Sequence, residues 1–365
     1  MDRWALPGPA HFLTKAIEAL REGQNLIVAC PENVVVRLAE TLDGRLSDDG
    51  WSVRRLRTVR DCDPLEQLFG DLELDAGESS RRSVAELCRR LRPRSVVLVD
   101  DVQNGDWPRW NRMLAEYEVA SRGVSAGDRA CLVVVVAGVP LANYPAKAAA
   151  LSIMPWQDVV GEIDILLYVR EKMRCQGALD KAGNLVARII AKLALWDFDL
   201  IDYLVQKERR DLFEPARLMS QYAEMIVMEA RFSDNWESGG RIKFDGVEWT
   251  HPLLIYRDNS RREELTTRLW AAQASEIMPL LEIHRRALCR RMRPYIKLPV
   301  VIDDQRFDDL DDIEIGPLAH VAQRAKMPSK IVQSAEKWRR LRNKLAHLEA
   351  LGYLEALDRE LLYPN

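Results

Sequence analysis

Arg342, Asn343 and His347 are residue types that could act on a phosphate group, and they lie together in the segment WRRLRNKLAHLEAL (338–351). The same segment predicts an ordinary amphipathic helix, because large apolar residues recur at helical spacing and would form one buried stripe. These apolar residues are Trp338, Leu341, Leu345 and Leu348. The three polar residues are therefore either half of a nuclease site or ordinary polar side chains of a packed helix.

The spacing of the polar residues limits what one helix can do. Asn343 and His347 are four residues apart and would share one face of a helix. Arg342 and His347 are five residues apart, which places them about 140° apart around an ideal helix. One straight helix does not easily bring these two groups to a single phosphate. A helix from a second copy of the chain could complete the site.

The motif LRNKLAHL resembles the RxxxxH motif of HEPN domains, and the resemblance covers about residues 262–365. It implies a small helical domain that dimerises, with a first long helix at 265–292 kinked at Pro279, and a metal-independent endoribonuclease activity. By position, it implies that Arg342 holds the scissile phosphate and that Asn343 orients a reacting group. It also implies that His347 acts as general acid or base, which suits a side chain whose ordinary pKa is near neutrality.

Basic residues near the motif and in the long helix before it are candidates for contacts with RNA phosphates. We predict RNA binding by Lys337, Arg339, Arg340, Lys344, Arg285, Arg286 and Arg290. The alternative is that these basic helix faces are simply solvated. His284 lies on an apolar stripe and is predicted to be a core residue, as is His320.

The first part of the chain alternates short apolar runs with helical patterns, which predicts an α/β fold with a parallel sheet covered on both faces. The expected strands are 25–30, 51–59, 95–101, 130–138 and 150–156. We expect four segments: an α/β domain (1–156), a helical domain resembling an ATPase lid (157–239), a β-hairpin connector (240–261) and an all-helical HEPN-like domain (262–365). The hairpin is indicated by Asp245-Gly246 between two β-rich runs.

The run SVVLVDD (95–101) resembles the Walker B strand of AAA-type and STAND-type P-loop ATPases, in which carboxylates bind Mg²⁺. In this chain they would be Asp100 and Asp101. The first strand, however, is followed by PENVVVRLAE, without the GxxxxGK[ST] loop that cradles phosphates. Pro31 also removes an amide donor from that place. We therefore expect an ATPase-like scaffold that uses no nucleotide cofactor, with the two aspartates inactive or capping the next helix.

Composition restricts the other classes. The net charge of −3 means that any nucleic-acid surface must be a local patch, and six scattered cysteines without a CxxC pair argue against a zinc site or a disulfide framework. The longest apolar run, from residue 130, is too short to span a bilayer, and no signal peptide is evident. We expect a cytoplasmic protein without membrane contact or bound metal.

Two functions remain open. The first is an RNase effector of a bacterial anti-phage or toxin system, as the combined resemblances imply. The second is a non-enzymatic adaptor within a larger complex. In both, the C-terminal segment is expected to form a homodimer or to bind another subunit. We expect the self-association to use helices that carry Leu269, Ile277, Leu281 and Leu345.

Overall fold

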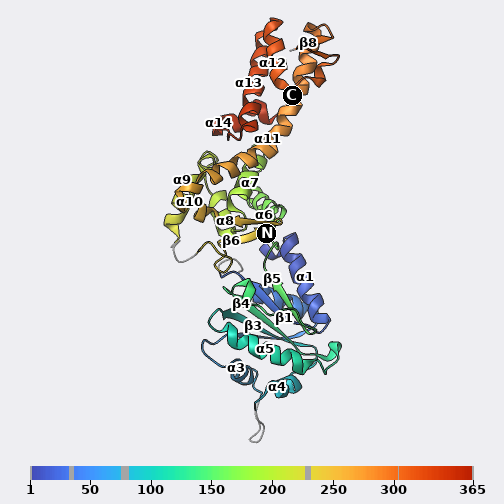
Figure 1. Ribbon diagram of the computed structural model, residues 1–365, viewed down its shortest axis with the longest axis vertical. Helices are drawn as coiled ribbons and strands as arrows, with labels where there is room; N and C mark the ends of the chain where they lie inside the picture. Colours follow the sequence, from blue (N-terminus) through green and yellow to red (C-terminus); the bar gives the residue numbers. More distant parts are fainter. Residues whose placement is uncertain (1, 33–36, 75–81, 227–231, 303, 364–365) are drawn as a thin grey trace. The chain divides into compact units, whose positions relative to one another are not determined.

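The computed structural model describes residues 2–32, 37–74, 82–226, 232–302 and 304–363. The chain divides into two compact units, each built from two separate stretches (Figure 1). The sheet unit contains Met1–Asp164 and Val227–Leu254, and the helical unit contains Ile165–Ile226 and Ile255–Asn365. This division differs from the four consecutive segments expected from the sequence, because the hairpin joins the sheet unit and the lid-like helices join the C-terminal helices.

The sheet unit contains a five-stranded parallel sheet in the order β2-β3-β4-β1-β5. Its strands are β1 (Asn25–Cys30), β2 (Ser52–Arg57), β3 (Ser95–Gln103), β4 (Cys131–Ala137) and β5 (Leu151–Pro155). Each expected apolar run forms a strand, so the predicted α/β class and parallel sheet are confirmed. Strands β1 and β4 are buried along almost their entire length, which explains their continuous apolar sequences.

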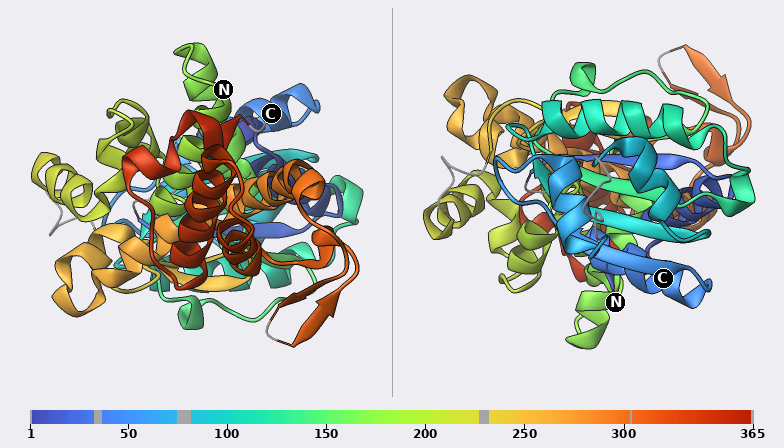
Figure 2. Two further views of the ribbon diagram at one scale, coloured as in Figure 1. Left: turned by 90° about the horizontal axis from the view of Figure 1, so that it is seen from above. Right: turned by 90° about the horizontal axis from the view of Figure 1, so that it is seen from below.

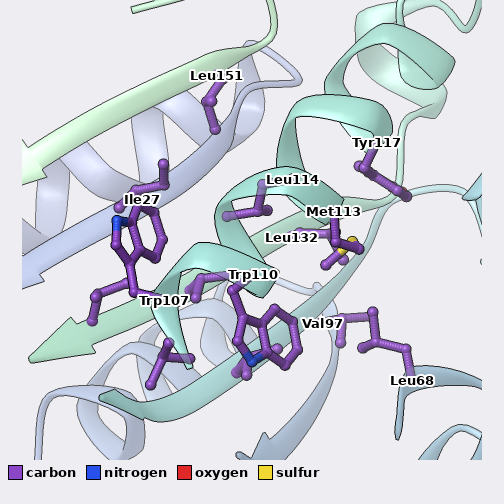
Figure 3. Packing of buried hydrophobic residues seen from close by; sticks show 14 of the residues in the cluster. Ile27, Leu68, Val97, Trp107, Trp110, Met113, Leu114, Tyr117, Leu132 and Leu151 are labelled. Carbon is purple, nitrogen blue, oxygen red and sulfur yellow. The ribbon is translucent and has the colours of Figure 1, made fainter. Parts of the chain in front are cut away.

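Helices cover both faces of this sheet. Helices α3 (Pro64–Asp71), α4 (Val84–Arg90) and α5 (Trp107–Ser121) supply one core, in which Trp110 and Leu114 pack over Val97 and Leu132 (Figure 3). Helix α5 runs alongside the strands in the right-hand view of Figure 2. Helix α1 (Pro7–Arg21) packs on β1, and α2 (Leu38–Asp48) packs on β2 and β3. Each face of the sheet is thereby covered, except along the edge strand β2, most of whose side chains are exposed.

A two-stranded hairpin follows the pattern predicted from Asp245-Gly246. Its strands are β6 (Arg241–Phe244) and β7 (Val247–Thr250), and both turn residues have a positive φ, 50° and 77°. Asp245 accepts a hydrogen bond of 2.9 Å from the Glu162 amide, and Asp158 accepts one of 2.8 Å from the Gly246 amide. The hairpin is therefore fastened to the segment after β5 and belongs to the sheet unit.

The helical unit is organised around the long helix α11 (Glu263–Met292), which runs through Pro279 and packs against α7, α13 and α15. The other helices with residues in this unit are α6 (Glu162–Cys175), α7 (Lys181–Ala194), α8 (Phe198–Val205), α9 (Pro215–Met225), α10 (Pro252–Arg257), α12 (Ile315–Arg324), α13 (Ser329–Ala346), α14 (Tyr353–Ala356) and α15 (Arg359–Leu362). A short hairpin, β8 (Val300–Ile302) and β9 (Gln305–Phe307), interrupts the segment that was expected to be entirely helical.

The residues expected to mediate self-association lie inside this unit. Leu269, Ile277, Leu281 and Leu345 are all buried, with at most 5% of each side chain exposed. Their side chains are therefore not available to a second copy in this structure, and self-association of the C-terminal segment stays a prediction. No helix among the described residues is both long enough and apolar enough to cross a lipid bilayer.

Candidate functional site

The helix that carries the motif ends earlier than the sequence pattern predicted. Helix α13 stops at Ala346, and His347 is its C-cap residue. Leu348 follows with a positive φ of 62° and is 64% exposed, so its predicted place in the buried stripe is wrong. The amides of Leu348 and Glu349 donate to the carbonyls of Leu345 and Lys344, at 3.3 and 2.9 Å. This is the hydrogen-bond pattern of a Schellman motif, in which a leucine occupies the position usually taken by glycine.

The chain after α13 is held in place by two side chains of α11. The Trp270 indole donates to the Leu345 carbonyl at 2.7 Å. Gln273 is fully buried, and its amide both donates to the Leu351 carbonyl (2.9 Å) and accepts from the Leu351 amide (2.6 Å). A polar residue within the apolar series Leu269, Ile277 and Leu281 was the sequence signal for this role, and sequence reasoning missed it.

The structure places Arg342 and His347 on different parts of the surface. Arg342 donates to the Glu314 carboxylate at 3.0 Å and lines a hollow of about 240 Å³, with apolar side chains of α11 and α12. Asn343 and His347 are exposed and line another, more open hollow of about 560 Å³ along α13. One chain therefore brings Asn343 and His347 together but leaves Arg342 outside that hollow.

The basic residues of α13 are neutralised locally. Each predicted RNA-binding residue here has a carboxylate within 4 Å: Arg339 pairs with Glu336 (2.7 Å), Arg340 with Glu355 (3.9 Å), Lys344 with Glu355 (3.0 Å), and Lys337 with Asp358 (3.0 Å) and Glu360 (2.8 Å). Burial opposes ionisation of Glu355, but the hydrogen bonds from Lys344 and the Gly352 amide, together with the charges of Lys344 and Arg340, outweigh it and lower the pKa of this carboxyl. Each of the cations expected to form an RNA-binding patch is thus paired with at least one carboxylate.

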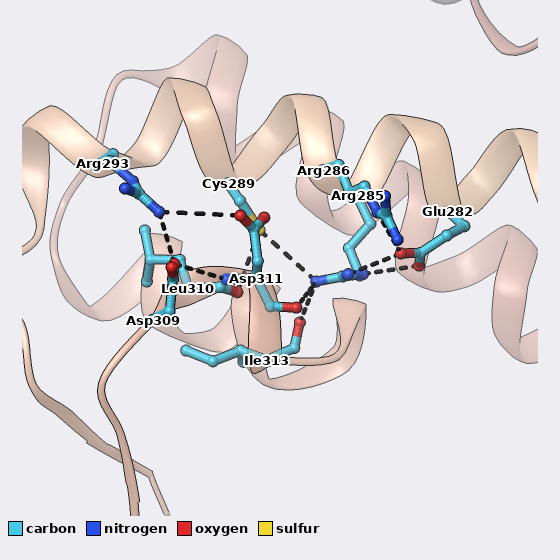
Figure 4. A network of polar contacts seen from close by, with 9 residues as sticks. All are labelled: Glu282, Arg285, Arg286, Cys289, Arg293, Asp309, Leu310, Asp311 and Ile313. Carbon is cyan, nitrogen blue, oxygen red and sulfur yellow. Dashed lines mark hydrogen bonds and ion pairs between the residues drawn. The ribbon is translucent and has the colours of Figure 1, made fainter.

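The predicted contacts in α11 also differ from an RNA-binding patch (Figure 4). Arg285 is only 13% exposed; it pairs with Glu282 (2.7 Å) and donates to the carbonyls of Asp311 and Ile313, at 2.8 and 2.9 Å. It fastens the segment before α12 to α11, so its assignment as a phosphate contact is wrong. Arg286 is exposed and pairs with Glu282 at 3.1 Å. Arg290 is exposed and has no ion-pair partner among the residues that the structure describes.

Two further histidines were assigned to the core. His284 is buried, its ring stacks on Trp338 with centroids 4.2 Å apart, and its Nε2 lies 2.9 Å from the Leu361 carbonyl oxygen. The core prediction for His284 is therefore confirmed. His320 is exposed on α12, so the same prediction for it is wrong.

At the carboxyl end of β3, the two aspartates form a β-bulge. The register between β3 and β4 shifts between Val99 and Val102, and Asp101 has a positive φ of 64°. The Asp101 carboxylate accepts from Arg57 at 3.1 Å, and Asp100 Oδ1 accepts from the Asp101 amide at 2.9 Å. Burial raises the pKa of the Asp100 carboxyl. Helix α5 has Asp106 as its N-cap residue, so neither Asp100 nor Asp101 caps it, contrary to that expectation.

The place of the missing phosphate loop is acidic where the structure describes it; residues 33–36 lie outside the described part. The Glu32 amide donates to the Glu237 carbonyl at 2.8 Å and is therefore not free for a phosphate. The Glu32 side chain lies against Gly138 at the end of β4, where a Cβ atom would come within 2.3 Å of the carboxylate. No cluster suited to a metal ion occurs among the described residues. Carboxylates without a cation would repel a triphosphate.

No protein-family model matches the chain, and no curated protein matches it.

Proposed function

We propose that this chain is a non-enzymatic scaffold protein whose helical unit binds a partner protein through the surface that follows α13. The observation that carries the proposal is a pair of exposed leucines, Leu354 (83% exposed) and Leu348 (64%). They are the two most exposed large apolar side chains among the described residues of that unit. Leu348 also has a left-handed backbone, which costs about 1–2 kcal/mol for a residue other than glycine. A partner that covers both leucines would offset this cost.

The charges around the motif support binding more than catalysis. Arg342 is paired with Glu314 and lines a different hollow from His347. Of the six basic side chains of α13, all but Lys330 have a carboxylate of the described residues within 4 Å, so little unbalanced positive charge is left to attract RNA. A surface of balanced charges with exposed leucines is typical of a protein-binding site.

The sheet unit supports the same proposal from the other part of the chain. Its sequence has no Gly-rich loop after β1, and its carboxyl edge carries Glu32, Asp100 and Asp101. We propose that this unit keeps the shape of an ATPase core without binding ATP. Titration of a fluorescent ATP analogue with Mg²⁺ should detect no micromolar binding. Tight binding that Asp100→Ala abolishes would contradict the proposal.

The partner surface can be tested without knowing the partner. A photo-crosslinking amino acid is introduced at Leu354 of the full chain, produced in the cells of its source organism. The control carries the same group at Met225, another exposed apolar residue of the helical unit, which lies in α9 and is 62% exposed. We expect a discrete cross-linked product from position 354, either with a second copy or with another protein, and none from position 225. Equal products at both positions, or none at 354, would refute the proposed surface.

Metal-independent RNA cleavage remains a second candidate, because Asn343 and His347 are exposed and share one hollow. Arg339 and Arg340 line that hollow as well, but the motif arginine, Arg342, does not, so a second copy would have to supply it. If the chain cleaves cellular RNA in EDTA, His347→Ala should slow cleavage by about 10²–10⁴-fold. Arg342→Lys should also impair it, since lysine lacks the planar fork. His320→Ala, at another exposed histidine, is the matched control. Cleavage lost only in the first two variants would replace the scaffold proposal with this one.

A further inference from the structure

The outer edge of β2 presents unpaired backbone groups. Strand β2 lies at one end of the sheet and pairs only with β3. The Thr58 amide donates to the Asp100 carbonyl at 3.0 Å, so Thr58 faces β3. Because successive residues of a strand point their backbone groups in alternate directions, Val53, Arg55 and Arg57 direct theirs away from the sheet.

One end of this edge is closed, and the rest is open. The Gln67 amide group of α3 donates to the Arg57 carbonyl at 2.7 Å, and its oxygen accepts from the Val59 amide at 3.1 Å. For Val53 and Arg55, no hydrogen-bond partner of the outward N–H and C=O lies within the described residues. The two N–H and two C=O groups of Val53 and Arg55 are therefore available at the surface, with the spacing needed to pair with another strand.

The opposite edge of the sheet does not offer such a template. By the same alternation, Leu151, Ile153 and Pro155 of β5 point outward, since the Trp156 amide donates to β1. Leu151 already pairs with Ala148 in an antiparallel bridge, and Pro155 has no N–H to donate. Of the two edges of the parallel sheet, as far as the structure describes it, β2 thus presents the open template.

The open edge is strongly basic. The segment WSVRRLRTVR (51–60) contains four arginines and no acidic residue. Arg57 pairs with Asp101 at 3.1 Å but is 82% exposed, and Arg55 is paired only loosely, with Glu40 at 3.8 Å. Arg54 and Arg60 are exposed and have no ion pair within the part of the chain that the structure describes. Any strand added here would meet a surplus of positive charge.

We propose that the outer edge of β2 binds an extended, acidic segment of a partner protein, which adds a strand to the sheet. A second copy of β2 is a poor occupant, because its arginines would face these arginines. A phosphate backbone is also a poor match, because phosphates accept hydrogen bonds but cannot donate to the outward carbonyls. This inference goes beyond the proposed function, since it concerns the sheet unit and does not require any binding at α13.

The decisive pair of variants is Arg55→Pro and Arg55→Ala. Both remove the same charge, but only proline removes the outward N–H, and the ladder with β3 does not use that group. Short random peptides displayed on phage would be selected on the immobilised full chain, and the best binders measured by fluorescence anisotropy. We expect peptides with alternating acidic residues. We expect their affinity to fall at least about tenfold further in Arg55→Pro than in Arg55→Ala, which corresponds to about 1.4 kcal/mol.

Controls keep the result interpretable. Circular dichroism must show that Arg55→Pro retains the thermal transition of the wild-type chain. If it does not, the wild-type chain is tested with two forms of each selected peptide, N-methylated at the odd or at the even residues. One form should bind and the other should fail. Equal affinity of the two Arg55 variants and of the two methylated peptides would overturn the proposal. So would selection of no acidic peptide, or equally tight binding of a polyuridine RNA that competes with the peptide.

Discussion

Asp101 and Leu348 have nearly the same unusual backbone in different surroundings. Asp101 lies at the bulge within β3 and Leu348 follows α13, two elements in which a sequence motif suggested chemistry, and their φ angles are 64° and 62°. The Asp101 carboxylate accepts hydrogen bonds from Arg57, and aspartate tolerates this region better than most residues. The Leu348 side chain is mostly exposed to water and makes no comparable polar contact.

The difference shows how strained positions can be sorted. At Asp101 the local hydrogen bonds account for the conformation, so no further role is needed to explain it. At Leu348 the backbone amide is used in the helix cap, but the choice of leucine is unexplained within one chain. A strained residue without local compensation is therefore the better indicator of a binding surface.

The largest effect is expected at the contact that fixes the chain after Leu348. Gln273→Ala leaves the buried Leu351 amide and carbonyl without their partner, and should destabilise the protein by about 2–4 kcal/mol. Gln323→Ala is the control, because Gln323 is exposed and bonds only to the Glu336 side chain. Chemical denaturation measures both. A small effect of Gln273→Ala would mean that this segment is loosely held. The positive φ of Leu348 would then no longer indicate a binding surface.

Replacement of the strained leucine tests the comparison directly. Leu348→Gly should stabilise the chain by about 1 kcal/mol, because glycine adopts a positive φ without a steric penalty. Ala346→Gly, two residues earlier and inside α13, should instead destabilise it by up to about 1 kcal/mol. Thermal unfolding of the two variants should shift in opposite directions. A Leu348→Gly chain that is less stable than wild type would show that Leu348 makes a stabilising contact.

The two regions should also respond to pH with opposite signs. Burial raises the pKa of Asp100, so its contribution to stability is present at low pH and is lost as the pH rises through the folded pKa. Asp100→Asn keeps the acceptor for the Asp101 amide and should therefore stabilise the chain at neutral pH. The pKa of Glu355 is lowered, so Glu355→Gln should destabilise the chain at neutral pH and have little effect below the folded pKa. Unfolding of both variants would be measured from pH 3 to pH 7. If the change in the free energy of unfolding, relative to wild type, followed pH in the same direction for both variants, this assignment would be contradicted.

The smallest effect is expected for the motif arginine. Arg342 and Glu314 form a surface ion pair, and such pairs contribute little in water. Arg342→Ala should change the free energy of unfolding by less than about 0.5 kcal/mol. A loss of several kcal/mol would show that the pair is structural and would remove Arg342 from the RNA-cleavage candidate.

Local sequence patterns predicted the strands of the sheet unit better than they predicted the helices. Strands β1 and β4 were readable because each is a buried, apolar run, and the hairpin because Asp245-Gly246 suits its turn. Helix α3 was missed although Asp63-Pro64 is a helix-start signal, with Asp63 capping the amides of Leu65 and Glu66. The end of α13 was misplaced because Leu348 continues the apolar spacing, and no glycine or proline marks the stop.

The candidate sites were less predictable, because their character depends on partners distant in sequence. Arg342 looked available for phosphate, but Glu314 lies 28 residues away in the chain. Arg285 looked like part of a basic patch, although its donors hold carbonyls of residues 311 and 313. No spacing rule shows which carboxylate or carbonyl a cation will meet once α11, α12 and α13 have packed.

The chain passes between its two units three times, near residues 164, 226 and 254. During synthesis, all five strands of the parallel sheet emerge before residue 165, but β6 and β7 of the same unit emerge only after α7, α8 and α9. The ribosome thus delivers an unfinished sheet unit while part of the helical unit is already exposed. A fragment that stops at residue 164 would lack the hairpin that the Glu162 and Asp158 contacts hold. To express either unit alone, both of its stretches should therefore be included and joined by a linker.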